Sequence, residues 1–218
     1  MATAITEFSK RVQPEVIGCP KFEVDRAVVD SIIRFCEDTH VLKRSFEHDV
    51  EDTDVDTADN DAVTVDISDY SITEKPLVIT EFRIDGALWE TSLLELQNDL
   101  DDMGVISVVG TKFFNFPSDT DIKFYDIDEV DQTFYIQLAV CPLTTITTID
   151  DFIYRRFRKA IEAGARWELK SMKGKTWSDP GMADRDLSIY NDGVARARIT
   201  IDKGYTKGST RVRSLRFF

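Results

Sequence analysis

Residues 150–202 read DDFIYRRFRKAIEAGARWELKSMKGKTWSDPGMADRDLSIYNDGVARARITID. The stretch predicts two long helices joined by the loop Lys173–Pro180. Asp179 can accept hydrogen bonds from the first N–H groups of the second helix, and Pro180 suits the first helical position because its missing N–H is not needed there. Apolar residues then recur at intervals of three and four, which predicts one buried helix face: Ala183, Leu187, Tyr190, Val194, Ala197 and Ile201.

The first of these helices is predicted to begin at the acidic pair Asp150-Asp151, which suits the positive end of the helix dipole. Small and apolar residues share its inner face: Ile153, Phe157, Ala160, Ile161, Gly164 and Ala165. Small residues allow a partner backbone to approach closely. The two helices are therefore predicted to form an antiparallel hairpin.

A third helix is predicted from Lys21 to about His40, where apolar residues again follow helical spacing: Val24, Ala27, Val28, Ile32, Phe35 and Cys36. We expect it to pack against the hairpin, so that both ends of the chain build one helical core. Ala2–Val12 is expected to be a loosely held arm or a short helix. Pro14, Gly18 and Pro20 predict a connecting loop.

The segment between these helices, from about Arg44 to Thr148, is predicted to be an insertion rich in strands. Its start, Glu47–Asp61, is heavily acidic and is expected to be a mobile loop or a ragged sheet edge. Leu93–Asp102 could form a short helix. Alternating or apolar runs predict strands at Ala62–Ile67, Leu77–Ile84, Val105–Phe116, Ile122–Asp126 and Thr133–Val140. Short antiparallel strands of this kind favour a small sandwich or barrel.

Charge is distributed very unevenly along the chain, whose net charge is −13. Residues 1–44 carry 7 basic and 7 acidic side chains, residues 45–150 carry 4 and 25, and residues 151–218 carry 16 and 8. Solubility alone could explain the excess of acid. The alternative is functional: one surface repels polyanions while another binds a partner.

The last segment, Lys203–Phe218, contains five basic residues and no acidic one. Its end is too short to build a core of its own, so we expect it either to fray or to dock as a strand or anchor on a neighbouring protein. The residues expected to bind the neighbour are Arg211, Val212, Arg213, Leu215, Arg216, Phe217 and Phe218.

Three segments of the helical hairpin, and two near the N-terminus, resemble head–tail adaptor (connector) proteins of tailed bacteriophages. The segments are Ala160–Ala165, Gly174–Pro180, Tyr190–Ala197, Arg11–Pro20 and Ile33–Thr39. The resemblance covers roughly the first 44 and the last 70 residues, and the acidic insertion is not part of it. It implies a helical bundle, residues 1–44 and 149–202, as the ring body. The strand patterns add an inserted antiparallel β-sandwich or barrel-like domain at residues 45–148, so the chain is predicted to be α+β, with a basic C-terminal extension at residues 203–218.

The resemblance also implies a function. Adaptors form a ring, typically of twelve copies, between the portal protein of the capsid and further neck or tail proteins, and double-stranded DNA passes through the ring. The chain is therefore expected to be a virion structural protein of the neck, assembled in the host cytoplasm, with no membrane partner. In that family the C-terminal extension commonly reaches the portal. Acidic domains around the bore would repel DNA phosphates, so we expect carboxylates of the insertion to face the lumen.

Basic residues near the start of the hairpin are expected to be exposed and, with an aromatic residue of the loop, are candidate contacts between subunits. They are Arg155, Arg156, Arg158, Lys159 and Trp177. Two alternatives remain open. The hairpin could be a nucleic-acid-binding module inhibited by the acidic domain, or the chain could be another neck or tail-completion protein with a different ring symmetry.

No pattern in the sequence predicts catalysis, a cofactor or a metal. Gly174-Lys175-Thr176 has Leu169 where a phosphate-binding loop needs glycine. The acidic run from Asp52 has Thr57 and Val63 where a calcium loop needs glycine and glutamate. His40 and His48 lack a completing ligand set and are expected to cap a helix or lie on its surface. Cys19, Cys36 and Cys141 are expected to be buried or idle thiols in a reducing compartment.

Overall fold

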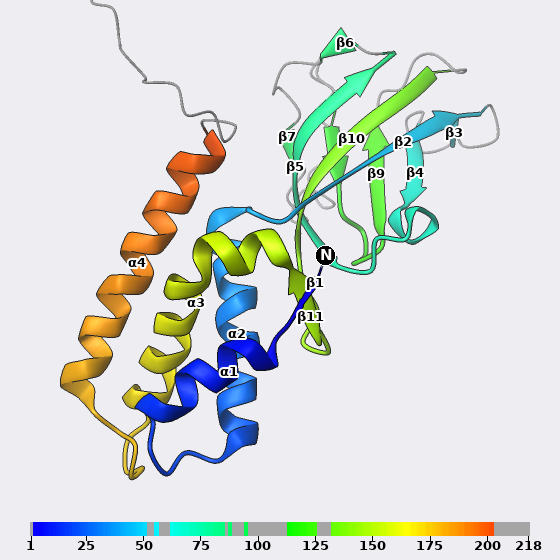
Figure 1. Cartoon of the computed structure of the whole chain (residues 1–218). Helices are drawn as coiled ribbons and strands as arrows, with labels where there is room; N and C mark the ends of the chain where they lie inside the picture. The colour runs from blue at the N-terminus through cyan, green and yellow to red at the C-terminus, as the bar shows by residue number, and fades with distance from the viewer. Residues whose placement is uncertain are drawn as a thin grey trace, which may run out of the picture.

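The computed structural model describes residues 2–51, 55–56, 62–85, 87–88, 94–95, 113–125 and 132–202. Within these ranges the chain is a mixed α+β protein, as predicted. The helices gather at one end of the molecule and the larger sheets at the other (Figure 1). The helices are α1 (Thr6–Val12), α2 (Lys21–Thr39), α3 (Asp151–Ser171) and α4 (Pro180–Asp202), with short 3-10 helices at η1 (Gln13–Glu15) and η3 (Ile67–Tyr70).

The described strands form three sheets, and every pair is antiparallel except β7–β8, which is parallel. One is a two-stranded ribbon, β1-β11; the others have the orders β2-β10-β5-β6 and β3-β4-β9-β8-β7. The strands are β1 (Ala2–Ala4), β2 (Lys43–Val50), β3 (Val55–Asp56), β4 (Ala62–Asp66), β5 (Lys75–Ile84), β6 (Ala87–Leu88), β7 (Leu94–Glu95), β8 (Phe113–Asn115), β9 (Asp121–Tyr125), β10 (Gln132–Cys141) and β11 (Thr148–Asp150).

The predicted hairpin is α3 and α4, and its start signals act as the sequence suggested. The Asp179 carboxylate accepts a hydrogen bond from the backbone N–H of Met182 at 3.1 Å, and Pro180 is the first residue of α4. The third predicted helix is α2, which ends at His40 in the left-handed conformation with φ of 53°. The N–H of His40 donates to the carbonyl of Cys36 at 2.8 Å, so this histidine caps the helix, one of the two placements expected for it.

Helices from both ends of the chain pack together. The predicted inner residues of α2 and α3 are buried, and on α4 four of the six predicted residues are buried while Leu187 and Ile201 are half-buried. The N-terminal arm belongs to this core as well, because Phe8 and Val12 of α1 are fully buried. The short-helix prediction for this segment is confirmed, but β1 was missed. It pairs with β11, 148 residues later in the chain, and Thr3 Oγ1 donates to the Asp151 carboxylate at 3.0 Å.

The two larger sheets meet through aromatic side chains. Phe82 of β5 stacks on Phe124 of β9 with ring centroids 5.0 Å apart, and Phe134 of β10 lies edge-on to both, at 5.2 and 5.6 Å. Aromatic pairs at such distances contribute beyond the area that they bury. The sheet orders of the described strands do not close into a barrel, so the barrel alternative is wrong for this part of the chain.

Strand predictions are confirmed for β4, β5, β9 and β10, within one or two residues at the ends. Of the two readings given for Glu47–Asp61, the loop is wrong where the segment is described, because β2 continues to Val50 and Val55–Asp56 form β3. The sheet-edge reading is confirmed there, because β2 and β3 are each the outermost strand of their sheet. Phe46 and Val50 point into the core while the acidic residues between them face outward. The segment is therefore a half-buried strand, although its many acidic residues suggested a loop. The short helix considered at Leu93–Asp102 is also wrong where it can be compared, since Leu94–Glu95 form β7. Much of the predicted strand Val105–Phe116 lies outside the described residues; Phe113–Asn115 form β8.

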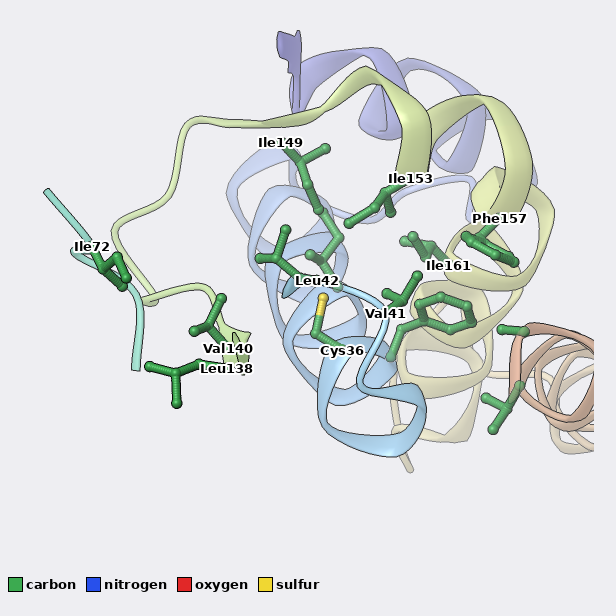
Figure 2. Close-up of a cluster of buried hydrophobic side chains, with 14 of the residues drawn as sticks. Cys36, Val41, Leu42, Ile72, Leu138, Val140, Ile149, Ile153, Phe157 and Ile161 are labelled. Atoms are coloured by element: carbon green, nitrogen blue, oxygen red, sulfur yellow. The ribbon is translucent and has the colours of Figure 1, made fainter. Parts of the chain in front are cut away.

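A continuous apolar cluster joins the helices to the sheets. Figure 2 shows side chains of α2, α3, β10 and β11 converging with those of the connections that follow α2 and η3. The labelled residues are Cys36, Val41, Leu42, Ile72, Leu138, Val140, Ile149, Ile153, Phe157 and Ile161. Beside the cluster, Arg44 of β2 donates to the carboxylates of Glu74 at 3.0 Å and Asp150 at 3.1 Å. These contacts fix the helical end against the strands.

Candidate functional site

The loop before α2 meets the loop between α3 and α4. Gly18 adopts a φ of +88°, which favours glycine, and a Cβ added there would lie 3.1 Å from Thr176 Oγ1. The side-chain amide of Gln13 donates to the carbonyl of Cys19 at 2.8 Å and closes the first loop. The N-terminal proline-glycine segment and the KGKTWSDP segment are therefore in contact at one end of the helices.

Further along the helices, polar groups connect α2 to both helices of the hairpin. Ser31 Oγ donates to the carbonyl of Ile161 at 2.8 Å, and Tyr190 Oη donates to the Asp38 carboxylate at 2.7 Å. Burial, followed by the hydrogen bond to Asp38, raises the pKa of the Tyr190 hydroxyl, so it remains a donor at neutral pH. These bonds fix how α2 is placed against α3 and α4.

Two glycines allow the helices to cross closely. A Cβ added at Gly193 of α4 would lie 2.3 Å from the Cβ of Ala160 on α3, and one at Gly164 would lie 2.4 Å from Ser31 Oγ. Neither space can hold a methyl group. The small residues on the predicted inner face thus allow the close backbone contact that the sequence indicated.

A buried ionic cluster also joins the hairpin, and the sequence prediction missed it. The Asp186 carboxylate accepts from Lys170 Nζ at 2.8 Å and from Arg166 Nε at 3.0 Å, with Glu15 of η1 3.3 Å from Arg166. The side chains of Lys170 and Asp186 are each only 5% exposed. Asp186 lies three residues after Ala183 and four before Tyr190, so helical spacing did place it on the buried face.

The predicted basic residues of α3 line a groove between α3 and α4. Its volume is about 470 Å³, and its residues are Arg155, Arg156, Phe157, Arg158, Lys159, Ala160, Ile189, Asp192, Gly193, Arg196 and Thr200. The buried side chains of Phe157 and Ala160 make its floor apolar, and Gly193 has no side chain to fill it. Arg155, Arg156 and Lys159 are exposed as expected, whereas Arg158 is half-buried. Five cations face one carboxylate in this groove.

Several groove cations also contact groups of the same chain. Arg155 lies 2.6 Å from Asp151, Arg196 lies 2.6 Å from Asp192, and Arg158 lies 3.5 Å from Glu162. Burial raises the pKa of Glu162, and the guanidinium groups of Arg158 and Arg11 offset this only in part. Exposed pairs one helical turn apart are weak, at about 0.3–0.5 kcal/mol each. Arg155 and Arg196 can therefore still bind an anionic partner, whereas Arg158 is held beside the largely buried carboxylate of Glu162.

Trp177, the fifth predicted contact, lies elsewhere. It is in the loop between α3 and α4, at the other end of the hairpin from the groove (Figure 1). Its ring is half-buried against the core with the Lys175 ammonium 5.6 Å from the ring centroid, and its Nε1 is buried with no hydrogen-bond acceptor within the described ranges. The structure thus separates Trp177 from the four basic residues.

Among the described residues, the candidate phosphate-binding and metal sites lack the geometry that such sites need. Lys175 lies over the Trp177 ring, and the adjacent Gly174 has open space around its Cα rather than a cradle. His48 Nδ1 lies 2.7 Å from Tyr70 Oη. No group of three His, Cys, Asp or Glu side chains that could hold a metal occurs among the described residues. The acidic run from Asp52 to Val63 lies largely outside them, as do all the tail residues Arg211–Phe218.

The three cysteines are buried free thiols, as expected. Burial raises the pKa of Cys36 strongly and that of Cys141 to about 11, so neither is a thiolate at neutral pH. None of the helices in the described ranges is both long and apolar enough to span a bilayer. No protein-family model matches the sequence, and no curated protein matches it either.

Proposed function

We propose that the protein is a head–tail adaptor of a tailed bacteriophage: a virion structural protein that forms a ring between the portal and the tail and lines the DNA passage. The observation that carries the proposal is the contact between segments from opposite ends of the chain. The N-terminal segments that resemble adaptors lie more than 100 residues before those of the hairpin, yet Gly18 lies against Thr176 and Asp38 binds Tyr190. They share one packed body, as parts of one architecture would.

The charge distribution supports a role around DNA. Residues 45–150 hold 25 acidic and only 4 basic side chains. We propose that the strands complete a sandwich around Phe82, Phe124 and Phe134, and that carboxylates of this sandwich face the bore of the ring. A negative bore repels DNA phosphates and lets the duplex slide without binding. A ring structure whose bore is lined by Lys and Arg would contradict this placement.

Imaging the purified protein together with portal rings of the same virion tests the function directly. We expect a ring of twelve copies seated below the portal. A measured ring mass that corresponds to six copies would favour another neck or tail-completion protein, the second reading of the sequence. No ring with or without the portal would contradict both.

The portal contact is assigned to the basic C-terminal extension. Deleting residues 211–218 should leave the helical circular dichroism signal unchanged and abolish co-sedimentation with portal rings. A variant with Arg211, Arg213 and Arg216 changed to lysine keeps the charge and should retain binding. Unchanged co-sedimentation of the truncated protein would contradict the assignment.

The groove cations favour a second candidate function, a nucleic-acid-binding module. Phosphate contacts would make DNA affinity fall steeply with salt. Filter binding of the intact protein at low and high salt measures this slope. Retention of DNA at low salt that disappears at high salt would favour the module, and no retention at low salt would exclude it.

A further inference from the structure

The groove between α3 and α4 combines an apolar floor with cationic walls. Arg155, Arg156, Lys159 and Arg196 line it together with Phe157. The exposed side of α4 adds Ile189, which is 39% exposed at the edge of the groove. A surface of this kind suits a partner segment that presents carboxylates around a few apolar atoms.

The same chain carries a segment with this chemistry. β2 is the outermost strand of its sheet, so one of its edges pairs with no described strand. Successive side chains of a strand face opposite sides. Phe46 and Val50 are buried, whereas Glu47, Asp49 and Glu51 are exposed on the other face. Glu47 and Asp49, with Glu51 directly after β2, thus form a row of carboxylates on the outward face of an edge strand, and Asp49 also accepts a hydrogen bond from Thr133 Oγ1 at 2.8 Å.

The two surfaces lie on different sides of the molecule. α4 forms one outer side of the helical end, while β2 runs away from it toward β3 and β4 on the other side (Figure 1). The groove of one molecule can therefore receive the β2 edge of the next, leaving a free groove and a free edge at the two ends of the pair. A head-to-tail contact of this kind joins two different surfaces and can repeat from one subunit to the next. It closes into a ring when the rotation between neighbouring subunits brings the last subunit back to the first.

We propose that the α3–α4 groove binds the acidic β2 edge, Glu47–Glu51, of a second copy of this chain, and that this contact joins neighbouring subunits. The proposal deepens the proposed ring function and rests on it. Exposed groove cations attract the carboxylate row, and Ile189 and the groove floor lose water on contact. Charge complementarity favours this occupant over DNA, because the acidic region of the same chain would compete with any phosphate for the groove.

Charge reversal with rescue tests the contact. A groove variant carries Arg156→Glu and Lys159→Glu, and an edge variant carries Glu47→Lys and Asp49→Lys. Sedimentation velocity at low salt, with and without portal rings, should show association weakened roughly tenfold or more for either variant alone. Mixing the two variants should restore assembly, because each interface then again joins opposite charges. Lys173→Glu with Arg185→Glu, the same charge change outside the groove, is the matched control and should assemble normally.

Disulfide trapping gives a second readout that does not depend on affinity. The native cysteines are buried, so introduced thiols at exposed positions are the reactive ones. The double variant Lys159→Cys with Glu47→Cys should yield a ladder of covalent multimers when oxidised by oxygen with a copper catalyst. Each single-cysteine variant should give no ladder beyond a dimer.

Several results would overturn the proposal. Rings that form unchanged in the groove variant, or a double-cysteine variant that gives no ladder within rings, would reject this interface while leaving the ring function in place. Groove variants that assemble normally but lose salt-dependent DNA retention would assign the groove to nucleic acid instead. Wild-type protein that never assembles, even with portal rings, would reject the ring function together with the interface.

Discussion

Replacing Asp186 with asparagine should destabilise the protein strongly. The substitution keeps the shape of the side chain and removes its charge, while Lys170 and Arg166 remain at 2.8 and 3.0 Å. The amide oxygen of asparagine can accept from one of these cations, and its NH2 group cannot accept from the other. A buried cation has lost its hydration on folding, and without its counter-charge no interaction compensates for that loss.

The magnitude follows from burial. Breaking a buried ion pair by removing one partner typically costs about 3–5 kcal/mol. Glu15 lies 3.8 Å from Lys170 Nζ and compensates part of the charge, so we expect the lower end, about 3 kcal/mol. With a urea slope of roughly 2–3 kcal/mol/M for a chain of this size, the unfolding midpoint should fall by about 1–1.5 M.

Urea unfolding followed by circular dichroism measures this shift, and two further variants separate its causes. Asp192→Asn removes an exposed pair from the same helix and should change stability by less than about 0.5 kcal/mol. Combining Asp186→Leu with Lys170→Met removes the two most buried charges and leaves Arg166 its ion pair with Glu15 at 3.3 Å, so it should recover part of the loss, because the desolvation penalty of Lys170 disappears. A loss below about 1 kcal/mol for Asp186→Asn, or no recovery in the double variant, would refute the reasoning.

Substitutions at two glycines, and the reactivity and titration of the cysteines, give further expected outcomes. In urea unfolding, Gly193→Ala should lower the free energy of unfolding by about 1–2 kcal/mol, because the added Cβ would lie 2.3 Å from Ala160. Gly181→Ala is the control: the nearest atom to its Cβ is 3.7 Å away, so the protein should gain up to about 1 kcal/mol from helix propensity. Cys141, with its pKa raised to about 11, and the more strongly shifted Cys36 should resist a thiol reagent at pH 8 until the protein unfolds. Folding raises these pKa values, so the thiols of the unfolded chain lose their protons at a lower pH than those of the folded protein. The free energy of unfolding should therefore decline as pH rises from 9.0 toward 11. Rapid labelling of the folded protein at pH 8, or a free energy of unfolding that rises over this pH range, would contradict the burial of the thiols.

Sequence reasoning succeeded where one local rule decided the structure. The intervals of three and four in α2 and α3, and the Asp179-Pro180 start of α4, predicted helices and their buried faces. Alternation of Val63, Val65 and Ile67 with polar neighbours predicted β4 and the residue that follows it.

It failed where distant parts of the chain determine the structure. Nothing in Ala2–Ala4 indicates a strand until Thr148–Asp150 pairs with it. In β2 the acidic side chains outweigh the two buried apolar residues, so composition suggested a loop. For the candidate site, exposure of Arg155 and Lys159 was predictable from helical spacing. Their groove was not, because it depends on how closely Gly193 approaches Ala160.

The long separation between contacting partners has a consequence for synthesis. The hydrogen bond from Tyr190 to Asp38 spans 152 residues, so the part of α2 that packs on α4 stays uncovered until α4 has been made. The strands β2 to β10 need only residues 43–141 and can form while translation continues. A polypeptide released before α4 is complete keeps Phe35 without its Tyr190 neighbour and lacks half of the groove. Only chains that include α4 can therefore enter an assembly built on the helical end.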